Sequence, residues 1–469
     1  MRILIIGATG FIGNRILKSL IEKPLDPQQA VIALTRSSAP KTESTAVEWR
    51  SCDLFSLMQT EVAVRDADVA IYLVHSMLPA ARLNQSSFED TDLILADNFA
   101  RACRKNGVER IIYLGGLIPP SGALSAHLRS RLEVEHALAA YGAKVTTLRA
   151  GLVLGSEGSS FQILAQLVKK LPVLICPSWT RSTTQPVAVP DVIQLVRYVI
   201  QKESLEPGPY DIGGPDRLSY QELMEFTAKV LGLRRRFFSL SVFSPGLSLL
   251  WVRFITGASR NLITPLIQSL KHEMVVQNRK LLDQVPFSMT GLESALREAL
   301  RGIKPTLRTS TRARAQQLKI KRDVRSIQRL PLPQGRSAAW MAQEYFRWLP
   351  RSLAPLILVT PNTRGETASV FWEFRFRFFP WPLLILKEAP ERSTSDRTLL
   401  RIVGGVLVAK DSSPSARLEF REVLGGSHAL AAIHDFKPRL PWPIYKFTQA
   451  VAHLWVMNRF RAHLSEKPI

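Results

Sequence analysis

Apolar and polar positions along the first 150 residues form blocks that suit strands and helices in turn. The chain begins with a short apolar run, Met1 to Ile6, and continues with the amphipathic segment Phe11 to Lys23. Later apolar runs are separated by further amphipathic segments, which is the pattern of a parallel sheet connected by helices. The other expected strands are 30–34, 47–50, 67–74, 110–114 and 144–149, and the expected longer helices are 88–105 and 125–141. The first fold class is therefore α/β, with a doubly wound parallel sheet.

Three glycines separate the first strand from the first helix, at Gly7, Gly10 and Gly13. In a Rossmann-type fold, the first permits a tight turn and the second lets the backbone approach a pyrophosphate. The third allows close packing of helix on strand. Free N–H groups and the positive end of the helix dipole then face the phosphates, although a ligand-free strand-turn-helix is the structural alternative. The residues expected to contact the cofactor here are Gly7, Thr9, Gly10, Phe11, Ile12 and Gly13.

Residues at the ends of the next strands refine the expected cofactor. Arg36 follows the second strand, where an acidic residue normally binds the ribose hydroxyls of NAD, and Ser37 and Ser38 stand beside it. A guanidinium there suits a 2′-phosphate, which favours NADP, with NAD and a merely solvated Arg36 as alternatives. The segment containing Asp53 and Leu54 is expected to face the adenine, and His75 to lie at the carboxyl end of strand four.

The chain changes character after about residue 305, so we expect two domains at 1–305 and 336–469, joined by a basic linker at 306–335. The segment from Arg301 to Arg329 contains ten Lys and Arg residues and a single acidic residue, Asp323. Alternating strands and a closing helix at 443–463 then predict an α+β domain. With WLP at 348–350 and ARLEF at 416–420, it resembles the helix-grip fold of the START and polyketide-cyclase superfamily. Phe374, Phe376, Phe378 and Trp381 are candidates to line an apolar cavity or a plain core.

Charge and composition limit the partners and the cellular compartment that we expect for this protein. The formal net charge of +23 suggests an anionic partner, such as a phosphorylated ligand or an anionic membrane surface. The basic run lacks interleaved aromatic residues and DNA-binding motifs, so nucleic acid is not expected. Three dispersed cysteines indicate a reducing compartment without disulfides or a metal site. No apolar run approaches the ~20 residues of a transmembrane helix, so we expect a cytoplasmic protein that is at most peripheral at a membrane.

Motifs over the first 300 residues resemble the atypical and extended short-chain dehydrogenase/reductase superfamily, in its NmrA-like branch. This resemblance implies NAD(P) binding and an oxidoreductase ancestry. The motifs YLVHSM at 72–77 and LSAHLRSR at 124–131 point to a bacterial subgroup with an additional C-terminal domain. The matching segments are the glycine turn, Cys52 to Leu54, 98–114, Leu148 to Gly151, Pro190 to Val192 and Tyr210 to Pro215.

The resemblance also identifies a departure at the catalytic positions. Reductases of this superfamily use a Tyr-x-x-x-Lys pair and an upstream Ser. Here His127 stands at the Tyr position, Arg131 at the Lys position, and Gly115 or Gly116 replaces the Ser. In one reading, His127 is a general acid/base that titrates near neutrality and Arg131 holds the ribose or phosphate. In the other, hydride transfer is lost and the cofactor has a sensing or structural role. The chain lacks both the Tyr hydroxyl and the Ser hydroxyl that would steady the substrate oxygen, and this favours the second reading.

Three hypotheses follow for function. The first is an NADP(H)-binding protein that reduces an apolar carbonyl or quinone-like compound. The second is a non-catalytic, NADP(H)-dependent sensor or assembly factor. The third is a peripheral membrane-associated binding protein that docks through its basic linker.

Overall fold

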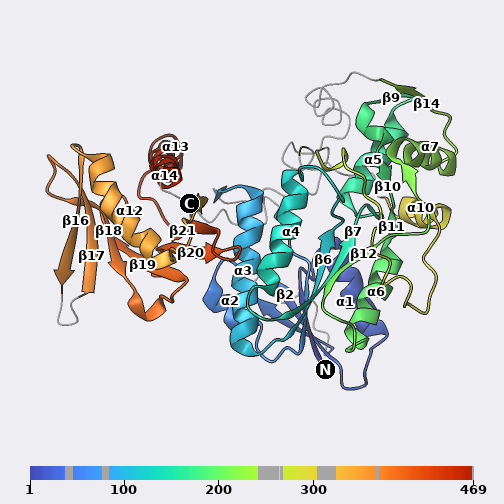
Figure 1. Ribbon diagram of the computed structural model, residues 1–469, viewed down its shortest axis with the longest axis horizontal. Helices are drawn as coiled ribbons and strands as arrows, with labels where there is room; N and C mark the ends of the chain where they lie inside the picture. Colours follow the sequence, from blue (N-terminus) through green and yellow to red (C-terminus); the bar gives the residue numbers. More distant parts are fainter. Residues whose placement is uncertain are drawn as a thin grey trace. The chain divides into compact units, whose positions relative to one another are not determined.

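The computed structural model describes residues 1–36, 46–76, 84–240, 264, 268–303, 324–364 and 369–466 (Figure 1). The chain forms two compact units, each with its own sheet. The first unit comprises Met1–Leu78 and Leu95–Arg314, and the second comprises Pro79–Ile94 and Ala315–Ile469. The division therefore differs from the expected 1–305 and 336–469, because a short segment near residue 85 belongs with the C-terminal unit.

Seven strands form the sheet of the first unit, in the order β12-β7-β6-β4-β1-β2-β3. Every neighbouring pair is parallel, which confirms the doubly wound α/β fold. The chain order reverses between β1 and β4, so their carboxyl ends border a crevice of the kind in which such sheets bind ligands. The strands are β1 (Arg2–Ile6), β2 (Ala30–Thr35), β3 (Val47–Ser51), β4 (Val69–Tyr72), β6 (Arg110–Gly116), β7 (Lys144–Ala150) and β12 (Gly208–Ile212).

Helices cover both faces of this sheet. Figure 1 shows α2, α3 and α4 on one side, and α1 and α6 on the other. The central strands bury apolar residues on both faces, as expected for parallel strands between two helical layers. Ile5, Ile71 and Ile112 lie in register on one face, Leu4, Ala70 and Ile111 lie in register on the other, and all six are nearly inaccessible. The helices are α1 (Phe11–Glu22), α2 (Leu57–Ala63), α3 (Phe88–Asn106), α4 (Ala126–Ala139) and α6 (Val189–Gln201).

A smaller lobe of the first unit has its own apolar core around Phe161, Leu223 and Leu296. Trp179 packs edge-on against Tyr220 with ring centroids 6.4 Å apart. The apolar side chains of this region therefore serve packing within the lobe. The lobe consists of α5 (Ser159–Lys170), α7 (Tyr220–Val230), α10 (Leu292–Arg301), the 3-10 turn Ser178–Arg181, β8 (Val153–Leu154), β9 (Val173–Cys176), β10 (Thr183–Thr184), β11 (Val187–Ala188), β13 (Leu218–Ser219) and β14 (Arg236–Ser239).

Eight strands form the sheet of the second unit, in the order β16-β17-β18-β19-β20-β21-β15-β5. All pairs are antiparallel except β15 with β5. Two longer helices, α12 (Ala338–Leu353) and α14 (Gln449–Ser465), pack on one face around Tyr345 and Phe460. The remaining elements are β5 (Asn84–Gln85), β15 (Val324–Pro331), β16 (Ile357–Arg364), β17 (Ser369–Phe376), β18 (Pro382–Glu388), the 3-10 turn Pro390–Arg392, β19 (Arg397–Gly404), β20 (Arg417–Val423), β21 (His428–Phe436) and α13 (Trp442–Phe447).

The antiparallel sheet with a long final helix agrees with the α+β expectation, whereas membership of the helix-grip class stays a prediction. The closing helix is divided, because Thr448 leaves helical geometry with φ −122° and ψ −85°. None of the described helices is long and apolar enough to cross a bilayer.

The basic segment 306–335 also differs from a simple linker. Residues 304–323 lie outside the described residues, but Val324–Pro331 forms strand β15 within the sheet. Arg325 lies 3.6 Å from the Asp435 carboxylate, and the Arg329 Nε donates to Asp90 Oδ1 at 2.7 Å. These arginines are therefore neutralised and packed, and they do not contribute to an exposed basic strap.

A buried ion cluster supports the second sheet from within. The fully buried Glu419 carboxylate accepts from Arg397 at 2.9 Å and Arg417 at 3.3 Å, and it also pairs with Arg421. Burial alone would raise the pKa of Glu419, but the three guanidinium groups outweigh it and hold that pKa well below its usual value. The carboxylate is therefore needed to balance three cations in one place.

Glu419→Gln should lower the stability of the second unit by about 3 kcal/mol, because it leaves buried guanidinium groups without their counter-charge. Denaturant unfolding followed by fluorescence measures the change. The matched control is Glu391→Gln, which removes an exposed carboxylate 2.9 Å from Arg401 and should cost less than about 1 kcal/mol. Equal costs for the two variants would contradict a structural role for the cluster.

Candidate functional site

The glycine turn after β1 is built as the sequence predicts. Gly7 adopts φ +88°, a conformation that side-chain-bearing residues rarely take, and the Gly10 N–H donates to the Gly7 carbonyl at 2.8 Å. A Cβ on Gly13 would lie 2.2 Å from that same carbonyl oxygen. The first turn of α1 is therefore pressed against the end of β1, with its free N–H groups directed beyond the strand.

The turn adjoins the carboxyl end of β4. The Leu73 N–H donates to the Ile6 carbonyl at 3.0 Å, and a Cβ on Gly7 would lie 3.2 Å from Leu73. His75 follows two residues later and is exposed. The glycine turn and His75 therefore border the same crevice between β1 and β4.

The other residues of the turn that were predicted to contact the cofactor differ in their solvent exposure. Thr9 and Gly10 are exposed, whereas Phe11 and Ile12 are half-buried. Phe11 packs closely on the smaller lobe, because a Cβ on Gly155 would lie 2.3 Å from its ring. The structure thus assigns Phe11 a packing role, and its contact with a cofactor stays a prediction.

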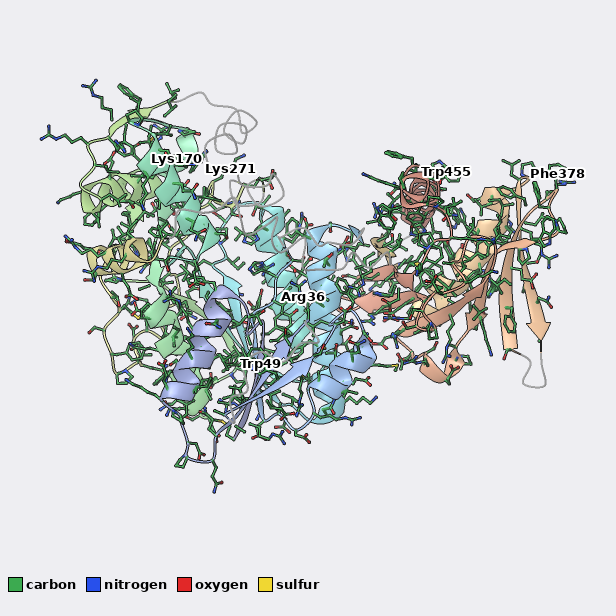
Figure 2. All side chains as sticks on the ribbon, turned by 180° about the vertical axis from the view of Figure 1, so that it is seen from behind. Arg36, Trp49, Lys170, Lys271, Phe378 and Trp455 are labelled. Carbon is green, nitrogen blue, oxygen red and sulfur yellow. The ribbon has the colours of Figure 1, made fainter. Side chains whose placement is uncertain are left out.

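The residues expected to contact the adenine half of the cofactor lie after β2 and β3. Arg36 is exposed directly after β2 (Figure 2), while Ser37 and Ser38 lie outside the described residues. Asp53 accepts the Phe55 N–H at 3.2 Å, which forms a local turn. Leu54 is held by Asn98, whose side-chain amide donates to its carbonyl at 2.7 Å. Asn98 is fully buried, and its positioning role was not predicted from the sequence.

His127 and Arg131 lie four residues apart on α4 and therefore share one face of that helix. Arg131 is buried, and the Tyr113 hydroxyl donates to its backbone carbonyl at 3.3 Å. Ser125 caps the helix by accepting the Leu128 N–H at 3.3 Å, and its hydroxyl lies 3.0 Å from that of Ser269. Tyr113 and Ser125 are thus positioning residues that the sequence analysis missed, although Ser before an amphipathic run is an N-cap signal.

The electrostatics of His127 overturn one expectation. Burial, the positive charge of Arg131 and the neighbouring His75 lower the pKa of His127 to about 3, so the imidazole does not titrate near neutrality. Its Nδ1 is buried and has no hydrogen-bond partner among the described residues. At neutral pH the ring is uncharged and can donate one hydrogen bond and accept another, but it is not an imidazolium acid.

The structure leaves little room for a side chain at Gly115, one of the two positions where the superfamily's serine would stand. A Cβ there would lie 3.0 Å from Thr147 Cγ2 and 3.1 Å from the Tyr113 ring, so a side chain would require movement. Gly116 packs on Arg131, whose Cγ would be 3.4 Å from an added Cβ. Gly116 therefore permits the close packing of α4 on β6, whereas Gly115 leaves room for Tyr113 and Thr147 within the sheet.

Motifs farther along the chain have structural roles. Asp191 accepts both the N–H and the hydroxyl of Thr290, at 2.8 and 2.7 Å, and Asp211 accepts the N–H groups of Gln277 and Asn278. The buried Gln185 connects the Gly214 carbonyl, at 2.6 Å, with the Val276 N–H, at 3.0 Å. These contacts fasten the returning chain over the carboxyl side of the sheet. Within the described ranges, no group of three or more His, Cys, Asp or Glu side chains could hold a metal ion.

The strand order and the glycine turn define a Rossmann-type α/β domain, which confirms the predicted fold of the first unit. Residues 3–213, slightly less than half of the chain, match the NAD dependent epimerase/dehydratase family.

Individual relatives support the fold. A 116-residue stretch is 33% identical to auxiliary protein GraX of Staphylococcus aureus and covers 24% of this chain. It spans only 36% of that relative. A nucleoside-diphosphate-sugar epimerase from Staphylococcus aureus superposes with a TM-score of 0.52 and 17% identity, over 64% of this chain and 100% of its own. Triphenylmethane reductase from Citrobacter sp. gives a TM-score of 0.50 and 19% identity over the same shares of the two chains.

Gly13→Ala should destabilise the first unit by about 2 kcal/mol or more and weaken dinucleotide binding, because its Cβ collides with the Gly7 carbonyl. Thermal unfolding and nucleotide titration measure the two effects. Gly291→Ala is the matched control, since a Cβ there meets nothing within 4 Å. A Gly13→Ala protein as stable as this control would show that helix and turn are not in close contact.

The low pKa of His127 should appear as a pH-dependent loss of stability. The folded state does not protonate this ring until about pH 3, whereas the unfolded chain does so near pH 6.5, so stability falls as pH drops below 6.5. Between pH 6 and 5, the wild type should lose about 1 kcal/mol more than His127→Gln. His136→Gln, an exposed position on the same helix, controls for loss of a histidine. Parallel pH curves for wild type and His127→Gln would contradict a buried neutral imidazole.

Proposed function

We propose that the first unit binds NADP(H) and uses it to reduce an apolar carbonyl or quinone-like compound. The observation that carries this proposal is the glycine turn, where the 2.2 Å approach of an added Gly13 Cβ to the Gly7 carbonyl shows that only glycine fits. Such close packing directs the α1 N-terminus at the crevice between β1 and β4, which suits a pyrophosphate. The fold shared with nicotinamide-dependent families supports the same assignment.

Several residues would hold the cofactor. The turn from Gly7 to Gly13 would meet the pyrophosphate, Arg36 the 2′-phosphate, and the Asp53–Leu54 loop the adenine. His75 and Arg131 would border the nicotinamide half, because the pKa of His127 is influenced by both. NADP is preferred over NAD because an exposed guanidinium follows β2, where a carboxylate would bind the ribose diol.

When bound, NADPH would supply a hydride to an electrophilic carbon of the substrate. His127 would donate a hydrogen bond from its neutral ring to the substrate oxygen, and Arg131 would supply a fixed positive charge beside it. Since the pKa of His127 is about 3, the proton that completes the alcohol would come from water at neutral pH. His127 is therefore proposed to polarise the substrate oxygen without acting as an imidazolium acid.

A second candidate is a non-catalytic NADP(H)-dependent sensor or assembly factor. The specific observation in its favour is a site that has neither the superfamily's phenol nor its serine, with a histidine held neutral. The partial relative GraX carries the name auxiliary protein, which is compatible with such a role. Under either candidate we propose a cytoplasmic location, since Cys52, Cys103 and Cys176 are all buried free thiols.

NADPH should bind at least about tenfold more tightly than NADH, because a charge-assisted bond to the 2′-phosphate adds its free energy to one cofactor alone. Arg36→Glu should remove that difference and leave NADH affinity nearly unchanged. Fluorescence titration measures both, with Arg234→Glu as a control that makes the same charge change elsewhere on the surface. Equal affinities for NADH and NADPH in the wild type would refute the role of Arg36.

Cofactor oxidation with a panel of quinones and aldehydes tests the chemistry. We expect turnover that varies little between pH 5 and 8, because the His127 ring stays neutral throughout that range. His127→Ala should lower kcat by about tenfold or more and leave NADPH affinity unchanged, while His136→Ala should behave as the wild type. Tight NADPH binding without turnover of any compound would instead favour the non-catalytic sensor or assembly factor.

A further inference from the structure

Aromatic side chains gather at the exposed tip between β17 and β18 in the second unit. Phe378 is 81% exposed and Trp381 64% exposed, and Phe379 and Leu356 are also mainly accessible. This differs from the sequence expectation that Phe376, Phe378 and Trp381 line a cavity or core, because only Phe374 packs against the apolar core. The tip therefore presents large apolar groups directly to solvent, which soluble surfaces rarely do in one place.

The tip is a defined structure. The Arg377 N–H donates to the Leu356 carbonyl at 2.9 Å, and the Phe379 N–H donates to the Phe376 carbonyl at 3.1 Å. The rings of Phe376 and Phe379 meet edge-on with centroids 6.2 Å apart. These contacts hold Leu356 beside the aromatic residues, so the apolar surface is organised before any partner arrives.

A second exposed apolar surface lies on the last two helices. Val451 and Trp455 are four residues apart on α14 and share a face, and Ile444 and Phe447 continue the surface on α13. Phe447 is 74% exposed. In Figure 2, Trp455 and Phe378 are both labelled at the upper edge of the second unit. We call the tip at 376–381 and this helical surface together the aromatic edge.

Cations accompany both parts of the aromatic edge, and acidic residues are missing from the sequence around them. The Arg459 guanidinium lies 4.9 Å above the Trp455 ring, and the Lys446 ammonium lies 5.6 Å from the Phe447 ring centre. The sequence contains no Asp or Glu between Asp435 and Glu466, and none between Glu373 and Glu388. Arg377, Lys446 and Arg459 form no ion pair with another described residue. Aromatic rings beside such cations are the combination that suits the headgroup region of an anionic bilayer.

Other occupants fit this surface less well. A second copy of the chain would bring like charges together across a two-fold interface, which disfavours self-association. Nucleic acid would satisfy the cations, but it has no apolar layer to receive Leu356, Ile444 and Val451. A bilayer supplies both anionic headgroups and an apolar interior within a short depth.

We infer that the second unit docks on anionic lipid bilayers by inserting Phe378, Phe379 and Trp381 of the tip, with the α13–α14 surface lying in the headgroup layer. Arg377, Lys446 and Arg459 face the lipid phosphates. Within the described part of the basic run, Arg325 and Arg329 are already engaged in ion pairs, so the inference rests on the aromatic edge and not on these two arginines. The inference does not depend on turnover or on nicotinamide binding by the first unit.

Vesicle sedimentation of the full chain provides the first test. The wild type should sediment with vesicles of phosphatidylcholine and phosphatidylglycerol, more at low than at high salt, and hardly with phosphatidylcholine alone. The double variant Phe378→Ser, Phe379→Ser should lose about tenfold or more of the bound fraction, and Arg377→Glu should also weaken binding. Phe238→Ser, which removes an exposed phenylalanine of the first unit, is the matched control and should bind as the wild type.

A fluorescent label distinguishes insertion from surface attraction. The three native cysteines are buried, so a polarity-sensitive dye attached to Trp381→Cys should report that site. Its emission should shift to the blue on anionic vesicles, whereas the same dye on the exposed position Val173→Cys should not respond. No capture by anionic vesicles at low salt would overturn the inference. Capture without an emission shift, or binding of duplex DNA that outcompetes vesicles, would also overturn it, as would a stable dimer that Trp455→Ser dissociates. Circular dichroism and thermal melts confirm that each variant is folded.

Discussion

The close approach of α1 to the end of β1 is the constraint on which the first unit depends. A Cβ at Gly13 would lie 2.2 Å from the Gly7 carbonyl, so the helix starts against the strand with no side chain between them. This geometry fixes where the helix N-terminus points and brings the turn against Leu73 at the end of β4. Contacts from Asp191, Asp211 and Gln185 then fasten the rest of the chain over the same side of the sheet. The proposed phosphate-binding crevice depends on packing that only glycine allows.

The neutral state of His127 depends on the same packing. The helix α4 lies close on β6 because Gly116 leaves room for Arg131. The arrangement half-buries His127 beside Arg131 and His75, and the desolvation and the neighbouring charges lower the pKa of its imidazole to about 3. The proposed site therefore combines a glycine turn suited to a pyrophosphate with a histidine that is a weak proton donor. Binding is the stronger part of the proposed function, and reduction must rely on polarisation and on the cofactor's own chemistry.

Sequence reasoning succeeded where a feature depended on local spacing and was less successful where distant residues decide it. The glycine turn and the parallel strands follow from periodicity and from three fixed positions, and the structure confirms both. Strand β15 was missed because Arg325 and Arg329 look solvated until Asp435 and Asp90 neutralise them, and Asp90 is 239 residues away from Arg329. The pKa of His127 and the outward direction of Phe378 depend on tertiary burial, which periodicity does not determine.

Native mass spectrometry of the full chain with NADPH tests the central claim most directly, because it counts bound cofactor without requiring turnover. The wild type should gain the mass of one NADPH, and Gly10→Asp should gain none, since its carboxylate would stand where the turn receives the pyrophosphate. Circular dichroism must show that the variant is folded. A wild type that gains no cofactor mass, or a folded Gly10→Asp protein that binds NADPH as tightly as the wild type, would contradict a dinucleotide site at this turn.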